Sequence, residues 1–176
     1  MMRQIGLTAL AIAVAAGGWA GYAQGHESRV SALLQPENEV PAVSSPAGGR
    51  FVAVVDDLNQ AVDFELTYAG LQADVRQAHI HMAQPNVNGG IMVWLCDSAT
   101  NPSPDEDTPA CPQSGTVTGT IGPADVVAAT SQGIAAGDFD EFLASIRKGL
   151  AYVNVHTAQS PGGEIRGQVR PGQRQE

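Results

Sequence analysis

The sequence predicts an all-β protein, a β-sandwich or Greek-key barrel with one short helical insertion. Apolar and polar residues alternate in eight short runs, as they do in strands that have one buried face. Glycine, proline, asparagine and aspartate fill the gaps between the runs, as turns require, and one segment has the spacing of a helix. About 150 residues follow a short N-terminal leader, which is enough for one domain with its own core.

The eight runs define the expected strands. Alternation is clearest in the segment VDFELTY, where Val62, Phe64, Leu66 and Tyr68 share the inward face. The other strands are expected, in chain order, at Val30–Leu34, Arg50–Val55, Gln77–Met82, Gly90–Cys96, Gly115–Ile121, Leu150–His156 and Glu164–Val169.

The helical insertion is expected at Asp138–Lys148. Phe139, Phe142, Leu143 and Ile146 recur there at helical spacing. The acidic start and the basic end of this segment suit the helix dipole, and the glycine that follows can terminate the helix. We expect the helix to cover one end of the sandwich, after a shorter turn at 123–125.

Residues 1–23 have the pattern of an export signal. Arg3 supplies a basic start, Ile5–Ala16 an apolar stretch, and a small-x-small cleavage site ends at Ala23. The apolar stretch is about 12 residues long, against the roughly 20 that span a bilayer, which favours a cleaved signal over a membrane anchor. We therefore expect a periplasmic or secreted protein, no membrane span in the mature chain, a domain over 24–170 and a disordered tail at 171–176.

The mature chain is strongly acidic. Removing Arg3 with the leader leaves 8 basic against 18 acidic residues, a net charge of −10. Such a surface repels nucleic acid and anionic membranes, so neither is expected as a partner.

The two cysteines, Cys96 and Cys111, bracket an irregular stretch rich in proline and acidic residues. In an oxidising compartment we expect them to form a disulfide, which would add on the order of 3 kcal/mol by closing a loop of about 15 residues. Ligation of a metal by these cysteines is the alternative, and it is weakened by the lack of Cys-x-x-Cys spacing.

Histidine is clustered in the sequence rather than frequent. His79 and His81 are two apart on one expected strand and therefore share a face, His156 lies on another strand, and the fourth histidine, His26, is near the start. Alternation places the three strand histidines on the non-core side, facing outward or into a shallow concavity shielded by the loop at 83–90. If the two strands are neighbours, the three rings converge and can chelate a metal ion.

The type of donor limits the choice of metal. Imidazole nitrogens favour copper, or less favourably zinc, over calcium and magnesium. Three imidazoles with an open fourth position can support redox or hydrolytic chemistry, and they can equally store, carry or sequester a metal. Met92 remains open as an axial ligand, whereas Met82 is expected to face the core.

Other polar residues are expected close to the histidines. Asn154 shares the face of His156, and a short hairpin after that strand would set Glu164 or Arg166 beside it. Arg166 could then attract an anion or hold a carboxylate. The alternative is an exposed cross-strand charge pattern of Glu164 and Arg166 on an ordinary polar strand face that also carries Tyr152 and Asn154.

Five stretches carry a resemblance to a known family: LLQPENEVPAV, GGRFVAVVDD, VDFELTYAGL, AHIHMAQPNVNGGIMVWL and GLAYVNVHTAQSPGGEIRGQV. They span Ala32 to Val169, and by them the chain resembles the CHRD domain, which is named from chordin and found in bacterial exported proteins. The resemblance implies an immunoglobulin-like β-barrel rather than a particular activity.

The same stretches resemble, more distantly, copper/zinc superoxide dismutase, in which a His-x-His strand and a later Val-x-His supply copper ligands. This resemblance implies copper binding by His79, His81 and His156. There are departures from it, because no histidine lies between His81 and His156 to bridge two metals and the zinc-binding histidines are absent. Arg166 lies near the region of that enzyme's substrate-guiding arginine, in a different register.

Three functions follow as hypotheses. The first is an exported module that binds copper, or zinc, through His79, His81 and His156. The second is a structural or protein-interaction module outside the cell, without metal, that uses the ENEVP segment and the acidic loop as its contact surface. The third is a small copper-dependent enzyme of the dismutase type. The sequence has neither a nucleophile elbow nor a phosphate-binding glycine loop, so neither serine-type hydrolysis nor phosphate binding is expected.

Overall fold

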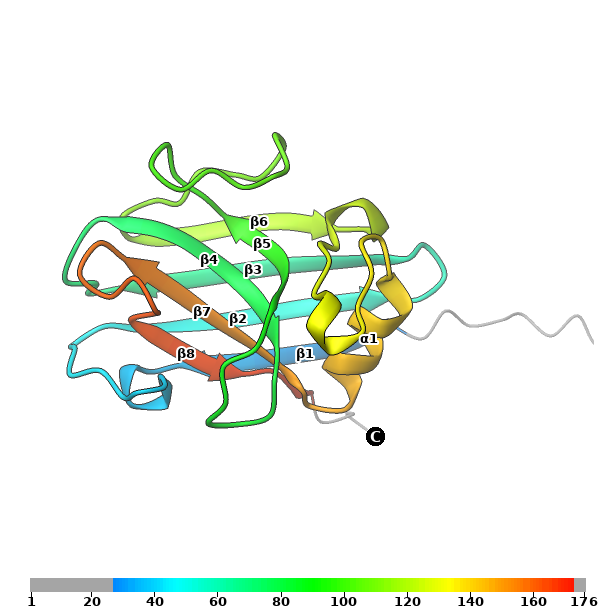
Figure 1. Ribbon diagram of the computed structural model, residues 1–176, viewed down its shortest axis with the longest axis horizontal. Coiled ribbons are helices and arrows are strands. Elements are labelled where there is room, and N and C mark those ends of the chain that lie inside the picture. Colours follow the sequence, from blue (N-terminus) through cyan, green and yellow to red (C-terminus); the bar gives the residue numbers. More distant parts are fainter. Residues whose placement is uncertain (1–26, 173–176) are drawn as a thin grey trace, which may run out of the picture.

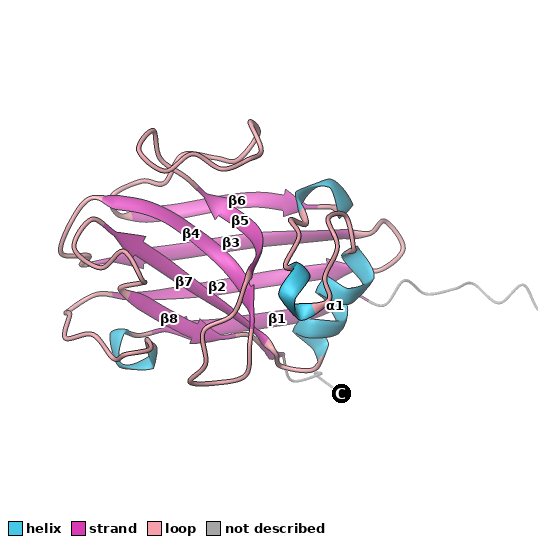
Figure 2. Ribbon diagram, in the orientation of Figure 1, coloured by secondary structure: helices cyan, strands magenta, loops and turns pink. Residues whose placement is uncertain are grey.

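The computed structural model describes residues 27–172, so the expected leader at 1–23 and the last residues of the expected tail lie outside the described residues. Two antiparallel sheets pack face to face, and this confirms the predicted all-β sandwich (Figure 1). Helices are short and lie at the ends of the sandwich (Figure 2).

Five strands form the first sheet in the order β6-β3-β2-β1-β9. Their bounds are Glu27–Leu34 for β1, Gly48–Asp56 for β2, Ala61–Ala69 for β3, Gly115–Ile121 for β6 and Arg170–Pro171 for β9. The second sheet has the order β5-β4-β7-β8. Its strands are β4 at Val75–Met82, β5 at Ile91–Cys96, β7 at Ala151–Thr157 and β8 at Ile165–Gln168.

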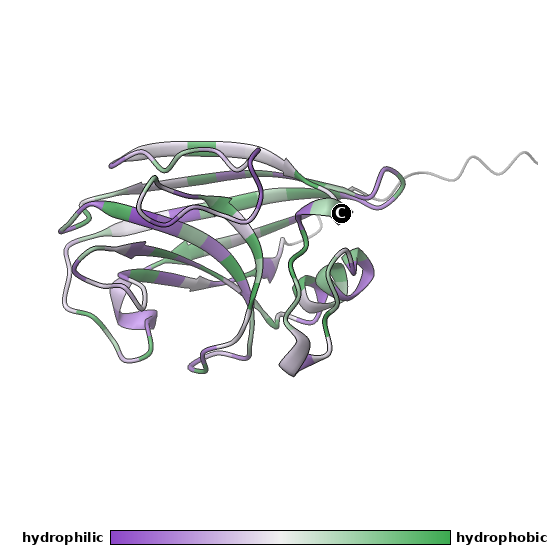
Figure 3. Ribbon diagram, turned by 45° about the horizontal axis from the view of Figure 1, so that its top comes forward, coloured by the Kyte–Doolittle hydropathy of each residue, from purple (hydrophilic) through white to green (hydrophobic). Residues whose placement is uncertain are grey.

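The core lies between the inward faces of the two sheets. In β3 the four predicted inward residues are buried, and their exposed neighbours alternate with them. Figure 3 shows the same alternation as bands of hydrophobic and hydrophilic residues along the strands. Phe51 of β2 stacks on Phe64 of β3 with their ring centroids 6.2 Å apart, so apolar contacts across neighbouring strands add to the contacts between the sheets.

Helix α1, Phe139–Arg147, covers one end of the sandwich as predicted. Asp138 caps it, because its side chain accepts a hydrogen bond from the backbone N–H of Glu141. The apolar face of the helix is buried, and Ser145 Oγ lies 3.5 Å from Met92 Sδ. Met92 therefore belongs to the contact between β5 and the helix. Three short 3-10 helices lie at Pro36–Asn38, Pro123–Asp125 and Thr130–Gln132.

Cys96 at the end of β5 and Cys111 in the following loop form a disulfide, with their Cα atoms 5.0 Å apart. It closes the irregular segment before β6, as the spacing of the cysteines predicts. Across residues 27–172 no helix is both long and apolar enough to cross a membrane.

Candidate metal centre

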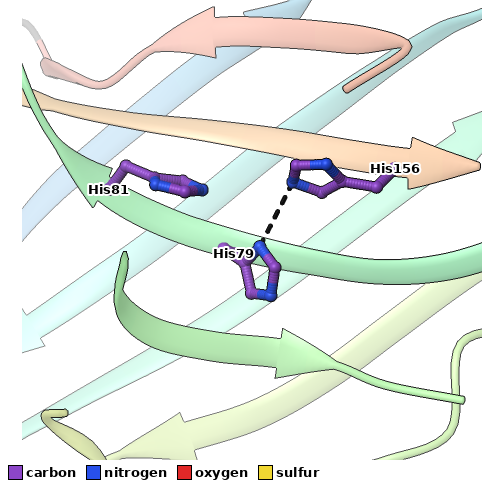
Figure 4. Close-up of side chains that lie close together, drawn as sticks. All are labelled: His79, His81 and His156. Atoms are coloured by element: carbon purple, nitrogen blue, oxygen red, sulfur yellow. Dashed lines mark hydrogen bonds between the residues drawn. The ribbon is translucent and has the colours of Figure 1, made fainter. Parts of the chain in front are cut away.

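Strands β4 and β7 are neighbours in the second sheet, and this brings the three histidines together. The antiparallel register sets His79 opposite Asn154 and Gln77 opposite His156. Because side chains alternate along a strand, His79, His81 and His156 all project from the face of the sheet that points away from the core. One nitrogen of each ring lies within 4.8 Å of the others. Figure 4 shows His81 and His156 extending toward each other along the two strands, with His79 beside them.

The triad, as we call these three histidines, is buried although it lies on the outer face of the sheet. His79 is 0 % exposed, His81 7 % and His156 6 %. The three histidines lie on the non-core face, as predicted, and the loop shields them there. The alternative prediction, an open cluster that faces outward, is wrong. The reason is that the loop at 83–90, which follows β4, returns over β4 and β7, the two strands that carry the triad.

Several hydrogen bonds hold this loop over the site. Gly89 donates its backbone N–H to the Tyr152 hydroxyl at 3.3 Å. Arg166 donates to the carbonyl oxygen of Val87 at 2.7 Å and to Oδ1 of Asn88 at 3.0 Å. The loop is therefore fastened to β7, the neighbour of β4, and to β8, the strand beyond it.

Hydrogen bonds also fix the orientation of two rings. Nδ1 of His81 lies 3.0 Å from the carbonyl oxygen of Gly89, and Nδ1 of His156 lies 3.0 Å from that of Pro161. A carbonyl oxygen can only accept, so Nδ1 is the protonated nitrogen in both neutral rings. Nε2 is then the unprotonated nitrogen in both rings, in the way that a backbone carbonyl orients a metal-ligating histidine.

Two ring nitrogens of the triad have no partner among the protein groups, and one of them, Nε2 of His79, points away from His156 (Figure 4). Nε2 of His81 and Nε2 of His79 are buried without a hydrogen-bond partner. Nε2 of His156 lies 3.2 Å from Nδ1 of His79 and 3.0 Å from Oδ1 of Asn154. A buried nitrogen without a partner costs about 1–3 kcal/mol, and coordination of a cation by Nε2 of His81 would remove that cost.

Burial keeps the triad neutral. Desolvation lowers the pKa of His79 to about 2, helped by the neighbouring His156 and His81. Desolvation likewise lowers the pKa of His81 to about 4 and that of His156 to about 4. At neutral pH no proton has to leave before a metal can bind, because neutral imidazole is the ligand form.

Aromatic rings line the triad. Trp94 of β5 meets His79 edge-on with ring centroids 4.3 Å apart, and Tyr152 stacks on His81 at 4.7 Å and an interplanar angle of 2°. The guanidinium carbon of Arg166 lies 3.4 Å from the centroid of the Tyr152 ring. Tyr152 is 2 % exposed, so its strand face is not the ordinary exposed one that the alternative interpretation of the sequence assumed.

The predicted neighbours of the triad divide into two groups. Asn154 lies beside His156, as expected, and Arg166 lies behind Tyr152, where it is 2 % exposed. Glu164 does not join them, because its carboxylate accepts hydrogen bonds from Ser45, Gln72 and Thr157.

An exposed charge pattern of Glu164 and Arg166 is therefore wrong, since both side chains are buried. Regular pairing in β8 begins at Ile165, one residue after Glu164, so the alternation that predicted a shared face does not extend to this residue.

Glu39 is the charged residue near the site that the sequence reasoning missed. It is 5 % exposed, and its Oε1 is buried without a hydrogen-bond partner. Burial raises its pKa to about 7, although the charge of Arg166 and hydrogen bonds from Val40 and Asn154 act in the opposite direction. Glu39 belongs to the ENEVP segment, which has no strand periodicity, so only the family resemblance of that segment could have drawn attention to it.

The three histidines fit a metal ion. Ring nitrogens no more than 4.8 Å apart all lie within about 2.8 Å of a common point, against ligand bonds of about 2.0–2.1 Å. Small ring rotations would close the difference. Imidazole donors suit copper and zinc. Met92 contacts Ser145 of α1, as described above, and Met82 packs against the core, so neither methionine belongs to the cluster of donors.

Comparison with known proteins bears on the fold and the family. Searches of curated proteins and of solved structures each found no match. The family model described as the CHRD domain matches residues 30–169, which include β2 to β8 and all three histidines. This match spans most of the chain, and the chain therefore belongs to the CHRD-domain family.

Proposed function

We propose that this CHRD-domain protein is an exported module that binds one copper ion through His79, His81 and His156, with zinc as the second choice. The observation that carries the proposal is the convergence of three buried, neutral rings, two of which are held at Nδ1 by carbonyl groups so that Nε2 carries the lone pair. Ligating histidines commonly have this arrangement, because a hydrogen bond at one ring nitrogen sets the other to bind the metal.

The geometry supports binding better than turnover. All three rings are less than a tenth exposed, and the loop at 83–90 lies between them and solvent. A dismutase-type reaction needs a copper that small anions can approach from solution. Arg166, the residue that could attract such an anion, is engaged with Val87, Asn88 and Tyr152.

Export is part of the same proposal. The leader pattern at 1–23 favours it, and the cysteine pair at disulfide distance fits an oxidising compartment. Periplasm and extracellular space are both consistent with these two observations.

The test is a metal titration of the chain from Gln24 onward at neutral pH. We expect one copper per chain, and weaker binding by at least tenfold in each of His79→Gln, His81→Gln and His156→Gln. The parent and the three variants all carry His26→Gln, because a histidine third from a free N-terminus chelates divalent copper together with the terminal amine, independently of the triad. If the parent chain binds neither copper nor zinc, the proposal fails and the protein-interaction hypothesis takes its place.

A further inference from the structure

We infer that the triad selects monovalent copper over divalent copper and zinc, an inference that rests on the proposed metal site. Two properties of the site favour this ion, namely the charges that the chain places around the triad and the number of donors that the triad offers.

The donors bring no negative charge. Among residues 27–172, the converging donor group consists of the three histidines, whose rings are buried and neutral. Cys96 and Cys111 are joined to each other, so no thiolate is available. A divalent ion bound here would keep both of its charges in a buried place, where each unit of uncompensated charge is costly.

Arg166 adds a fixed positive charge on one side of the triad. Tyr152 lies between His81 and Arg166, with the His81 ring against it at 4.7 Å and the guanidinium carbon 3.4 Å from its centroid. The three residues come from β4, β7 and β8, which are consecutive in the sheet. The positive charge repels any cation at the triad, and the repulsion is twice as large for a divalent ion.

Glu39 supplies one negative charge, which can balance Arg166 or a single charge on the metal but not both. Its carboxylate interacts with Arg166 and with Asn154, whose Oδ1 lies 3.0 Å from Nε2 of His156. With Glu39 ionised, Arg166 and Glu39 cancel, so a monovalent ion leaves the buried group with a net charge of one and a divalent ion leaves it with two.

The number of donors favours the same ion. Zinc sites in proteins are almost always four-coordinate, and divalent copper prefers tetragonal sites, whereas three nitrogen donors are sufficient for monovalent copper. A fourth ligand from solvent would have to pass the loop at 83–90, which Arg166 and Tyr152 hold in place.

The experiment measures dissociation constants for Cu(I), Cu(II) and Zn(II) at pH 8, each against a competing chelator, with Cu(I) handled without oxygen. We expect Cu(I) to bind at least tenfold more tightly than either divalent ion. Equal or tighter binding of Zn(II) or Cu(II) would overturn the inference and leave the proposed metal site intact. Failure of all three ions to bind would instead remove the proposed function itself.

Two substitutions test the role of charge. Glu39→Gln removes the negative charge at nearly constant size, so it should weaken Zn(II) and Cu(II) binding at least threefold more than Cu(I) binding. Arg166→Gln removes a positive charge, so it should act in the opposite direction and reduce the preference for Cu(I) over the two divalent ions. Glu37→Gln and Arg170→Gln are controls, because both residues are exposed, and they should leave the ratio unchanged. If Glu39→Gln leaves the ratio of divalent to Cu(I) dissociation constants unchanged, or lowers it, the role proposed for charge is contradicted.

Discussion

Each histidine of the triad has a different set of neighbours, and this makes the residues separable by experiment. His81 and His156 are oriented by backbone carbonyls, whereas His79 contacts His156 and the edge of Trp94. The unpaired Nε2 of His81, whose Nδ1 is held by Gly89, is a cost that the folded protein carries without metal. We interpret this cost as the sign of a site built to bind an ion rather than to fill space.

Trp94 should report copper binding. It is the only tryptophan after the expected leader, and its ring centroid lies 4.3 Å from that of His79. We expect copper to quench its fluorescence with an end point of one equivalent, because a copper ion at the triad would lie within a few ångströms of the indole. Trp94→Phe should abolish the signal while equilibrium dialysis still finds one copper per chain. Quenching that continues well beyond one equivalent would contradict binding at this site.

Glu39 should make the metal-free protein less stable as the pH rises. Its pKa is about 7 in the folded protein against 4.5 for an ordinary glutamate, so the folded state binds more protons between these two values. Its contribution to stability is therefore fully present below pH 4.5 and is lost as the pH rises through 7.

Glu39→Gln should consequently gain stability relative to the parent between pH 4.5 and 8, by up to about 3 kcal/mol. Urea unfolding at pH 4.5, 6 and 8 measures the difference. A difference that stays constant across this range would show that Glu39 does not titrate as described.

The histidines could be predicted and Glu39 could not, for a physical reason. Alternation along a strand fixes which residues share a face, so His79, His81 and His156 follow from their positions in two strands. Glu39 lies just after the short 3-10 helix at Pro36–Asn38, and its proximity to Asn154 depends on how a loop crosses the sheet. Local sequence carries no information about such a contact.

At the scale of elements, the loops after β4 and β7 hold the site closed and orient its ligands. The loop at 83–90 supplies the carbonyl of Gly89 to His81, and the turn between β7 and β8 supplies that of Pro161 to His156. The sequence indicated that the first loop could shield the histidines. It gave no sign of how completely, because burial by a loop depends on tertiary hydrogen bonds such as those of Arg166 and Tyr152.

Gly163 in the β7–β8 turn should not tolerate a side chain. Its φ is +124°, and a Cβ at this position would collide with Oε1 of Glu39 and lie 2.9 Å from Nδ2 of Asn154. Gly163→Ala should cost roughly 1–3 kcal/mol of unfolding free energy and weaken copper binding.

Gly162→Ala is the matched control for this substitution, because a Cβ there meets nothing within 4 Å. It should change the unfolding free energy by less than about 0.5 kcal/mol. Equal effects of the two alanines in chemical denaturation would show that the close approach of Glu39 to the turn is wrong.

The disulfide should stabilise the loop between β5 and β6 without acting on the triad. Replacing Cys96 and Cys111 together by alanine should lower the unfolding free energy by about 3 kcal/mol, because the unfolded chain loses the constraint on a loop of 15 residues. Copper stoichiometry should remain one per chain. Loss of copper binding in a variant that remains folded would place the cysteines in the metal site and contradict the ligand set.

For the whole molecule, the fold class could be predicted well because it depends on the period of the sequence. Each of the eight expected strands appears, and only the two-residue strand β9 and the exact strand ends were not expected. The order of strands within the sheets could not be predicted from that period alone. The site depends on one such fact, the pairing of β4 with β7, since without it His156 would lie apart from the other two histidines.

The most direct test of the central claim is a crystal structure of the copper-loaded protein with anomalous difference density measured at the copper edge. We expect a single peak, bonded at about 2.0 Å to one ring nitrogen from each of His79, His81 and His156. A peak elsewhere on the chain, or a copper bound by fewer than two of these rings, would contradict the account.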